Sequence, residues 1–243
     1  MKTKLFISIF CFISFFAQSQ DPQKTLSDAI TSGMLDNVKI AVEQQNADVN
    51  KVYKDKIQNN YPIHAACQLI NIEIVQYLLD KGAEVSSENR FGQTPLITLC
   101  YSFMGDTAST RKSLAIIDLL VAKGAELDVV GGGGHTAIAY AAERNKLEFV
   151  KKLIALKADV NKRGKSKISY TPLMNAAKLG NLEMVKALVE AGAEINEIRE
   201  HADGSVMITE NAASMASDGN FSEVLEYLKT KGAKAPKGRK IWK

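Results

Sequence analysis

Aliphatic side chains recur along this chain in short segments with the spacing of a helix. In the clearest segment they stand three or four positions apart, so one face of a helix would carry all of them: Leu182, Val185, Leu188 and Val189. Gly192 follows, and glycine commonly ends a helix because it adopts the left-handed conformation without steric cost. The pattern predicts a helix with one buried face.

A second, shorter helix is expected just before this one. Thr171 can cap its first turn, and Pro172 suits the first helical position because it has no amide hydrogen to leave unpaired. Ala176 and Ala177 are small and let a neighbouring helix approach closely. The segment from Thr171 to Asn196 therefore predicts a helical hairpin followed by an extended loop.

The same sequence motif is repeated along most of the chain. Further copies open at Tyr61, Asn89 and Thr136, and weaker copies extend from Ser27 to Asn50 and from Glu210 to Ala233. The step from Pro62 to Pro95 is 33 residues, and the step from Thr136 to Thr171 is 35. Because one hairpin cannot cover its own apolar face, the copies must stack, with the more polar first and last copies as caps.

This unit resembles the ankyrin repeat, which has a 33-residue period and the phrase Thr-Pro-Leu-His-x-Ala. The matching residues are Thr171-Pro172-Leu173-Met174-Asn175-Ala176 and Tyr61-Pro62-Ile63-His64-Ala65-Ala66. The resemblance implies an all-α ankyrin-repeat solenoid of about six helix-turn-helix units with extended finger loops. We expect this domain to span residues 20–233, with approximate repeats at 24–60, 61–92, 93–134, 135–169, 170–208 and 209–233.

The first residues have the composition of a signal peptide. Lys2 and Lys4 precede an unbroken apolar run from Leu5 to Ala17, and Ala17-Gln18-Ser19 offers small residues to a signal peptidase. The alternative, a membrane anchor, needs a run of roughly 20 apolar residues, and this run is shorter. We expect residues 1–19 to be removed and the mature protein to be exported, to the periplasm or the exterior.

Charge is unevenly distributed in the mature chain. The whole sequence has a formal net charge of +4, but seven cations and no acid lie from Lys229 onward. Residues 234–243 thus form a basic tail, and the rest of the mature protein is mildly acidic. An acidic, exported body argues against nucleic acid as a partner, whereas the segment Lys234–Lys243 could lie against an anionic membrane surface.

Two cysteines remain after the signal peptide. Cys67 and Cys100 occupy equivalent positions in consecutive repeats, on helices expected about 8 to 10 Å apart, which is too far for a disulfide. We predict two reduced, buried thiols. His64 stands where the ankyrin phrase has histidine, and the resemblance implies a structural role for it, hydrogen-bonding between neighbouring loops.

The chain shows no pattern typical of an active site. Gly131–Gly134 precedes a helix, as in phosphate-binding loops, but no Lys-Ser or Lys-Thr follows, so a flexible finger loop is the favoured interpretation. His135 and His201 lack a neighbouring cysteine or acid at ligand spacing. We expect no catalytic residue, no metal site and no cofactor.

In ankyrin-repeat proteins, partners bind to the finger loops and to the exposed face of the first helices, which together line the concave side. Carried to this chain, the resemblance implies these partner-binding residues: Leu69, Arg90, Phe91, Tyr101, His135, Arg144, Ile168, Tyr170, Leu179 and Met207. Arginine and aromatic residues anchor many interfaces, so Phe91, Tyr101, Arg144 and Tyr170 are the expected centre. Alternatively, these are scattered surface residues.

Two segments depart from the repeat. About nine extra residues lie near Ser102 to Lys112, between the two helices of the third repeat, and the loop from Asn196 to Met207 is long. Lysine and arginine in the fingers, at Lys51, Lys54, Lys56, Lys162, Arg163, Lys165 and Lys167, could steer an acidic protein partner.

The leading hypothesis is a non-enzymatic interaction scaffold, expected to be a monomer, that binds a protein partner of unknown identity. It would act as an immunity or inhibitor protein against a toxic enzyme, or as a protein that protects or anchors an exported enzyme. The alternative is attachment to the envelope through the basic tail on anionic lipid.

Overall fold

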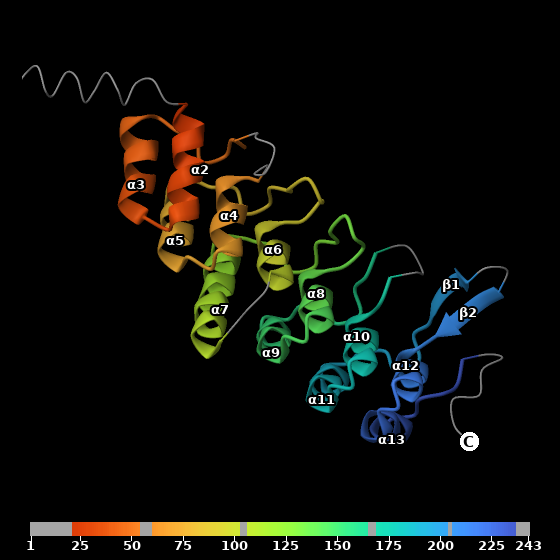
Figure 1. The fold of residues 1–243 in the computed structure, drawn as a ribbon. Helices are drawn as coiled ribbons and strands as arrows, with labels where there is room; N and C mark the ends of the chain where they lie inside the picture. Colours follow the sequence, from red (N-terminus) through yellow and green to blue (C-terminus); the bar gives the residue numbers. More distant parts are fainter. Residues whose placement is uncertain (1–20, 54–59, 103–105, 165–168, 204–205, 237–243) are drawn as a thin grey trace, which may run out of the picture.

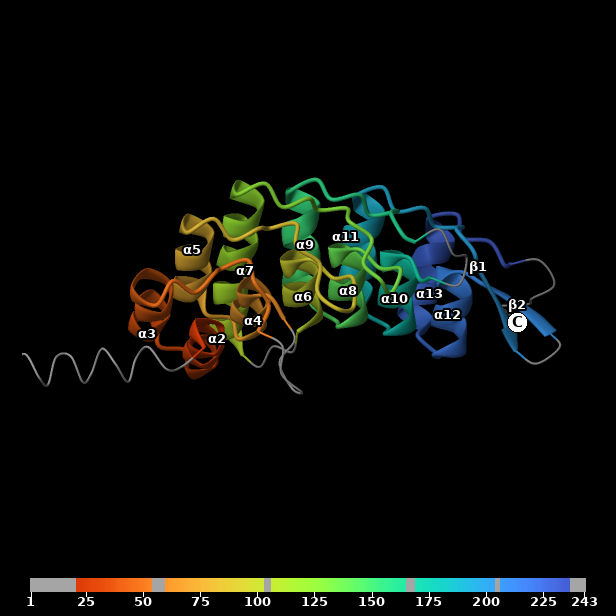
Figure 2. The ribbon, with the colours of Figure 1, turned by 90° about the horizontal axis from the view of Figure 1, so that it is seen from above.

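The computed structural model describes residues 21–53, 60–102, 106–164, 169–203 and 206–236. The expected signal peptide and most of the basic tail lie outside these residues. The described helices form an elongated stack in two rows, and loops project from one side of it (Figure 1). The view from above shows the same two rows, so the arrangement is a solenoid (Figure 2). None of the helices described is at once long and apolar enough to cross a membrane.

Each repeat contributes one helix to each row. The first helices are α2 (Pro22–Ser32), α4 (Pro62–Gln68), α6 (Pro95–Tyr101), α8 (Ala137–Glu143), α10 (Pro172–Lys178) and α12 (Ala212–Asp218). The second helices are α3 (Leu35–Lys39) with the π-helical turn η1 (Ile40–Gln44), α5 (Ile72–Asp80), α7 (Thr107–Ala122), α9 (Leu147–Ala155), α11 (Leu182–Glu190) and α13 (Ser222–Thr230). The expected all-α solenoid is confirmed.

The helix ends follow from the residues at them. The Thr171 hydroxyl accepts a hydrogen bond from the Met174 amide at 3.2 Å, and Thr94 and Thr136 cap α6 and α8 in the same way. Gly192 follows α11 with φ of +93°, in the left-handed region that favours glycine. The predicted start and stop of the helical hairpin are therefore both confirmed.

The core lies between neighbouring repeats. Ala66, Ala142 and Ala177 are fully buried where consecutive first helices meet, and their small side chains let the helix backbones approach. Both rows supply larger fully buried side chains, such as Leu96 on α6 and Ile116 on α7, and Phe149 on α9 is the largest of them. Because each apolar face is covered by the next repeat, the stack forms one continuous core.

Asparagines at the ends of repeats tie each repeat to the next. The Asn161 amide donates to the Gly192 carbonyl at 3.0 Å, and its oxygen accepts from the Glu194 amide at 2.8 Å. Asn50 makes the same two bonds to Gly82 and Glu84, and Asn196 makes them to Gly232 and Lys234. These bonds satisfy backbone groups that the turn after each second helix leaves free.

The turn between the two helices of a repeat also contacts the preceding repeat. Asn71 caps α5 and donates to the Gly33 carbonyl at 3.3 Å, and Asn181 caps α11 and donates to the Asn145 side chain at 2.7 Å. Lys146 takes this position in the fourth repeat. Its ammonium donates to the carbonyls of Leu99, at 3.4 Å, and of Ser102, at the end of α6.

The insertion near Ser102 to Lys112 differs from the sequence prediction. We expected it to lie between the two helices, but α7 begins at Thr107, so much of the insertion lengthens the second helix. This helix has 16 residues where α5, α9 and α11 have 9. Asp106 caps it through the Ser109 amide at 2.7 Å. Residues 103–105 lie outside the part of the chain described.

The long segment after Asn196 is ordered as a β-hairpin rather than a loop. Strands β1 (Arg199–Asp203) and β2 (Val206–Glu210) pair antiparallel, with Arg199 opposite Glu210. The two side chains form an ion pair at 2.7 Å. The hairpin projects from the same side of the stack as the other fingers (Figure 1).

Cys67 and Cys100 are fully buried free thiols, and burial raises the pKa of both well above its usual range. His64 is also fully buried and has the expected structural role. Its Nε2 donates to the Ser87 carbonyl at 3.0 Å, so its Nδ1 accepts from the Thr98 hydroxyl at 3.0 Å. The ring thus joins the second repeat to the third only when it is neutral.

Acid should weaken the fold through His64. Burial lowers the pKa of His64 to about 4 from its ordinary value of 6.5, so the unfolded chain binds the proton first as the pH falls. The contribution is present above pH 6.5 and lost toward pH 4, and amounts to about 3 kcal/mol in the free energy of unfolding. Urea denaturation at several pH values, compared with His64→Gln, measures this contribution. An equal pH dependence in both proteins would contradict it.

Candidate partner-binding surface

A long groove runs along the first helices of the first four repeats and the finger loops beside them. It has a volume of about 1670 Å³ and is lined from α2, α4, α6 and α8. Three apolar side chains in it are exposed to solvent: Leu69 at 50%, Phe91 at 57% and Tyr101 at 41%. Large apolar side chains that face water together in a concave surface are typical of a binding site.

The centre of the groove is a stack of aromatic and cationic side chains. The Arg144 guanidinium lies over the Tyr101 ring at 4.0 Å, and Tyr101 meets Tyr140 edge to face with the ring centres 5.3 Å apart. His135 packs on Tyr140, 5.1 Å between ring centres, and its Nδ1 donates to the Gly133 carbonyl at 3.0 Å. Arg144 is therefore held in place before any partner arrives.

Phe91 and Arg90 form a second pair, in the finger of the third repeat. The Arg90 guanidinium lies 4.6 Å from the centre of the Phe91 ring. Both residues are exposed and both line the groove. The finger bends tightly beneath them because Asn89 accepts hydrogen bonds from the Phe91 amide, at 2.9 Å, and the Gln93 amide, at 3.1 Å.

Glycines fix the fingers against one another. The Gly132 amide donates to the Gly92 carbonyl at 3.1 Å, and the Gly164 amide donates to the Gly134 carbonyl at 2.9 Å. A Cβ on Gly132 would collide with the Phe91 carbonyl oxygen. The loop Gly131–Gly134, expected to be flexible, is thus tied to both neighbouring fingers.

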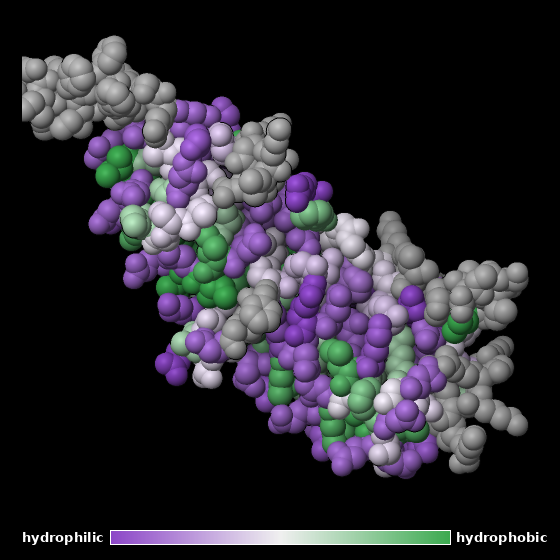
Figure 3. All heavy atoms as spheres, viewed as in Figure 1, coloured by the Kyte–Doolittle hydropathy of each residue, from purple (hydrophilic) through white to green (hydrophobic). Residues whose placement is uncertain are grey.

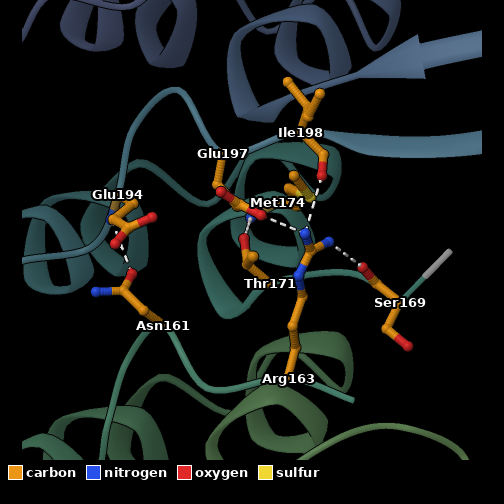
Figure 4. Close-up of polar contacts among 8 residues, drawn as sticks. All are labelled: Asn161, Arg163, Ser169, Thr171, Met174, Glu194, Glu197 and Ile198. Carbon is orange, nitrogen blue, oxygen red and sulfur yellow. Dashed lines mark hydrogen bonds and ion pairs between the residues drawn. The ribbon is translucent and has the colours of Figure 1, made fainter. Parts of the chain in front are cut away.

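Arg163 binds its own chain rather than facing a partner, contrary to the sequence interpretation (Figure 4). Its guanidinium donates to the Ser169 carbonyl at 3.0 Å, to the Ile198 carbonyl at 3.1 Å and to the Glu197 carboxylate. Only 14% of its side chain is exposed. Arg163 therefore joins the finger of the fifth repeat to the start of the hairpin.

Tyr170 belongs to this C-terminal part of the surface. Its ring lies between the Arg199 guanidinium, at 4.2 Å, and the Lys178 ammonium, at 4.8 Å. Leu179 follows at the end of α10 and is 42% exposed. Neither Tyr170 nor Leu179 lines the groove of the first four repeats.

The ten predicted residues fall into three sets. The groove contains Leu69, Arg90, Phe91, Tyr101 and Arg144. His135 supports Tyr140, while Tyr170 and Leu179 lie further along the stack. Ile168 and the side chain of Met207 lie outside the described residues. The structure adds Tyr140 and Lys146, which the sequence interpretation missed.

Lys146 is an unusual member of the groove because only 7% of it is exposed. Burial, with a smaller contribution from the nearby positive charge of Arg144, lowers the pKa of Lys146 to about 8. Its hydrogen bonds to the Leu99 and Ser102 carbonyls use its donors, so it serves the end of α6 rather than a reaction.

The histidine, cysteine and acidic side chains of the described residues are spread along the stack. Among the residues described, histidine, cysteine and acidic side chains form no group of three that could hold a metal ion. The two buried thiols are held in the protonated form, which is a poor nucleophile. In the view of Figure 3 most of the surface is hydrophilic, and apolar residues gather in separate patches.

The fold and groove define a repeat protein that presents an extended surface. The family model described as ankyrin repeats (3 copies) matches residues 26–109 and 104–199, more than half of the chain. The chain belongs to the ankyrin-repeat family. Ankyrin repeats generally serve as non-enzymatic modules that bind other proteins.

Three known proteins show the extent of the similarity. The ankyrin repeat protein OPG189 of variola virus is 32% identical over 95 residues, which are 38% of this chain and 15% of the viral protein. A putative ankyrin repeat protein of Acanthamoeba polyphaga mimivirus is 33% identical over 91 residues, 36% of this chain and 20% of its own. The ankyrin repeat, SAM and basic leucine zipper domain-containing protein 1 of Dasypus novemcinctus is 32% identical over 98 residues. These are 40% of this chain and 20% of that protein. The match thus spans at most a fifth of each relative.

The titration of Lys146 reports on the centre of the groove. We expect its ammonium to titrate near pH 8, where burial places the pKa, and we expect Arg144→Gln to raise this value because a neighbouring positive charge is removed. Nuclear magnetic resonance of lysine labelled at Cε, with the signal assigned by Lys146→Arg, measures both. Arg111→Gln, a change on α7, is the control and should leave the titration unaltered. A normal lysine pKa would show that the side chain is hydrated.

Proposed function

We propose that this protein is an exported binding protein of a bacterial envelope that holds a protein partner in its concave groove. The observation that carries the proposal is that three groove side chains, Phe91, Tyr101 and Arg144, stay exposed to solvent among the residues that the structure describes. Exposed aromatic and arginine side chains in a concave surface are the usual anchors of an interface.

Export is supported by the sequence of residues 1–19, with a basic start, an apolar run and small residues at the end. Within an envelope, two roles suit such a surface. The protein could block a toxic enzyme, as an immunity or inhibitor protein, or it could protect or anchor an exported enzyme. The protein would act as a monomer in either role.

The alternative function is attachment to the envelope. The segment Lys234–Lys243 carries Lys234, Lys237, Arg239, Lys240 and Lys243 without an acid, and includes Trp242. Such a segment would be drawn to anionic lipid. If this is its role, the full chain should sediment with vesicles of anionic lipid at low salt, and a chain ending at Ala233 should not. Equal sedimentation of both chains would rule out the tail as the anchor.

The leading function is tested by replacing the predicted centre of the surface. Changing Phe91, Tyr101, Arg144 and Tyr170 to alanine should abolish capture of native partners from envelope extracts, because exposed anchors of this kind contribute most of the binding energy. Capture by immobilised protein followed by mass spectrometry measures this, and the bait recovered from the native host should begin at Gln20.

A matched control changes exposed residues on the second helices: Glu73, Arg111, Glu183 and Lys186, each to alanine. This control should capture partners as the natural chain does. Thermal unfolding curves recorded by circular dichroism should show that both variants are folded. Unchanged capture by the first variant would refute the proposed surface, and a mature chain that keeps residues 1–19 would refute export by cleavage.

A further inference from the structure

The groove of the first four repeats has a charge opposite to that of the protein body. Among its lining residues that the structure describes, Arg90, Arg144 and Lys146 are cationic, and Glu148 is the one acid. The mature chain without its basic tail is mildly acidic. Positive charge is therefore concentrated in the groove, where walls of low polarity strengthen its field.

The two groove arginines differ from the paired arginines elsewhere in the stack. Arg163 pairs with Glu197, and Arg199 pairs with Glu210. Within the described part of the chain, no carboxylate lies within 4.0 Å of the Arg90 or Arg144 guanidinium. Both lie instead against aromatic rings, which orient the guanidinium but do not neutralise it.

Orientation matters because a guanidinium binds a carboxylate through two parallel hydrogen bonds in one plane. Arg144 is held by Tyr101, and Tyr101 is held in turn by the edge-to-face contact with Tyr140. Lys146 lines the groove close to Arg144 in the sequence, and its buried ammonium adds positive charge to the same surface. A carboxylate that binds here would order few additional side chains.

The groove also offers apolar side chains to an occupant. Leu69, Phe91 and Tyr101 are exposed beside the two arginines, and Gln68 and Asn60 offer amide groups along the same wall. The groove passes four repeats and stays open to solvent, so it fits an elongated occupant. An occupant that contacts both the arginines and the apolar side chains therefore needs carboxylates and apolar groups of its own.

We propose that the groove binds an extended acidic segment of the partner protein, with at least two carboxylates that pair with Arg90 and Arg144 and with apolar side chains between them that contact Leu69, Phe91 and Tyr101. This inference rests on the proposed function and names the chemistry of the partner. It predicts that affinity falls as salt is added, since exposed ion pairs are screened.

The test is a phage-display selection, in which random 12-residue peptides are selected for binding to the immobilised full-length protein. Selected peptides should be rich in aspartate and glutamate together with leucine or aromatic residues. Their affinity, measured by fluorescence anisotropy, should fall at least about tenfold in the double variant Arg90→Gln and Arg144→Gln, because two charge-assisted contacts are removed. Arg111→Gln, which removes an exposed arginine on α7 outside the groove, should leave affinity unchanged.

Charge reversal provides a second variant that tests specificity. With Arg90→Glu and Arg144→Glu, the preference should turn to peptides in which lysine replaces the acids. Circular dichroism should show that this variant is folded, as expected for changes at two exposed residues.

Several outcomes would overturn the inference. Selected peptides that are neutral or basic, or whose affinity ignores the double variant, would show that the arginines do not choose the partner. Displacement of the peptides by inorganic polyphosphate, with leucine-to-serine changes in the peptide having no effect, would show a general polyanion site. The inference would also be refuted if no selected peptide depended on the groove residues for binding. The capture experiment described above tests the proposed function separately.

Discussion

The structure depends on the requirement that each repeat be covered by its neighbour. A hairpin such as α10 with α11 has one apolar face, and that face becomes dry only when the next hairpin packs on it. Buried alanines set how closely the first helices approach, and larger residues such as Phe149 fill the space between the second helices. Hydrogen bonds from Asn50, Asn161 and Asn196 then fix each turn against the next one.

This requirement also explains how the chain accommodates its irregular parts. The insertion in the third repeat begins close to the end of α6, and Lys146 reaches from the fourth repeat to the carbonyls of Leu99 and Ser102. The equivalent asparagines, Asn71 and Asn181, contact the preceding repeat with a shorter side chain. A longer side chain at one position thus keeps the two repeats joined, and it brings a buried charge close to the groove.

Features encoded by local chemistry could be predicted from the sequence. Thr171, Pro172 and Gly192 mark helix ends through their own hydrogen-bonding and backbone preferences, and the equivalence of Cys67 and Cys100 follows from the period. The same period located the exposed faces of the first helices, which is why five of the ten expected residues line one groove.

Features that depend on distant partners could not be predicted in this way. Arg163 is close in sequence to several lysines that are expected to be exposed, and its partner Glu197 is 34 residues away. The polar start of α7 lacks the aliphatic spacing that indicates a helix, and β1 exists only because β2 pairs with it. Lys146 could have been noticed, since it stands where Asn71 and Asn181 stand in other repeats.

Among the described residues, the asparagine and lysine side chains that tie repeats together bind the adjacent repeat, and this has a mechanical consequence. A pulling force applied at the two ends of the stack would act on every junction in series, so the weakest junction would open first while the others held. The third and fourth repeats, joined by Lys146 and by the Gly132–Gly92 hydrogen bond, both line the groove. Tension that parted them would separate Tyr101 from Arg144 and so take apart the centre of the groove.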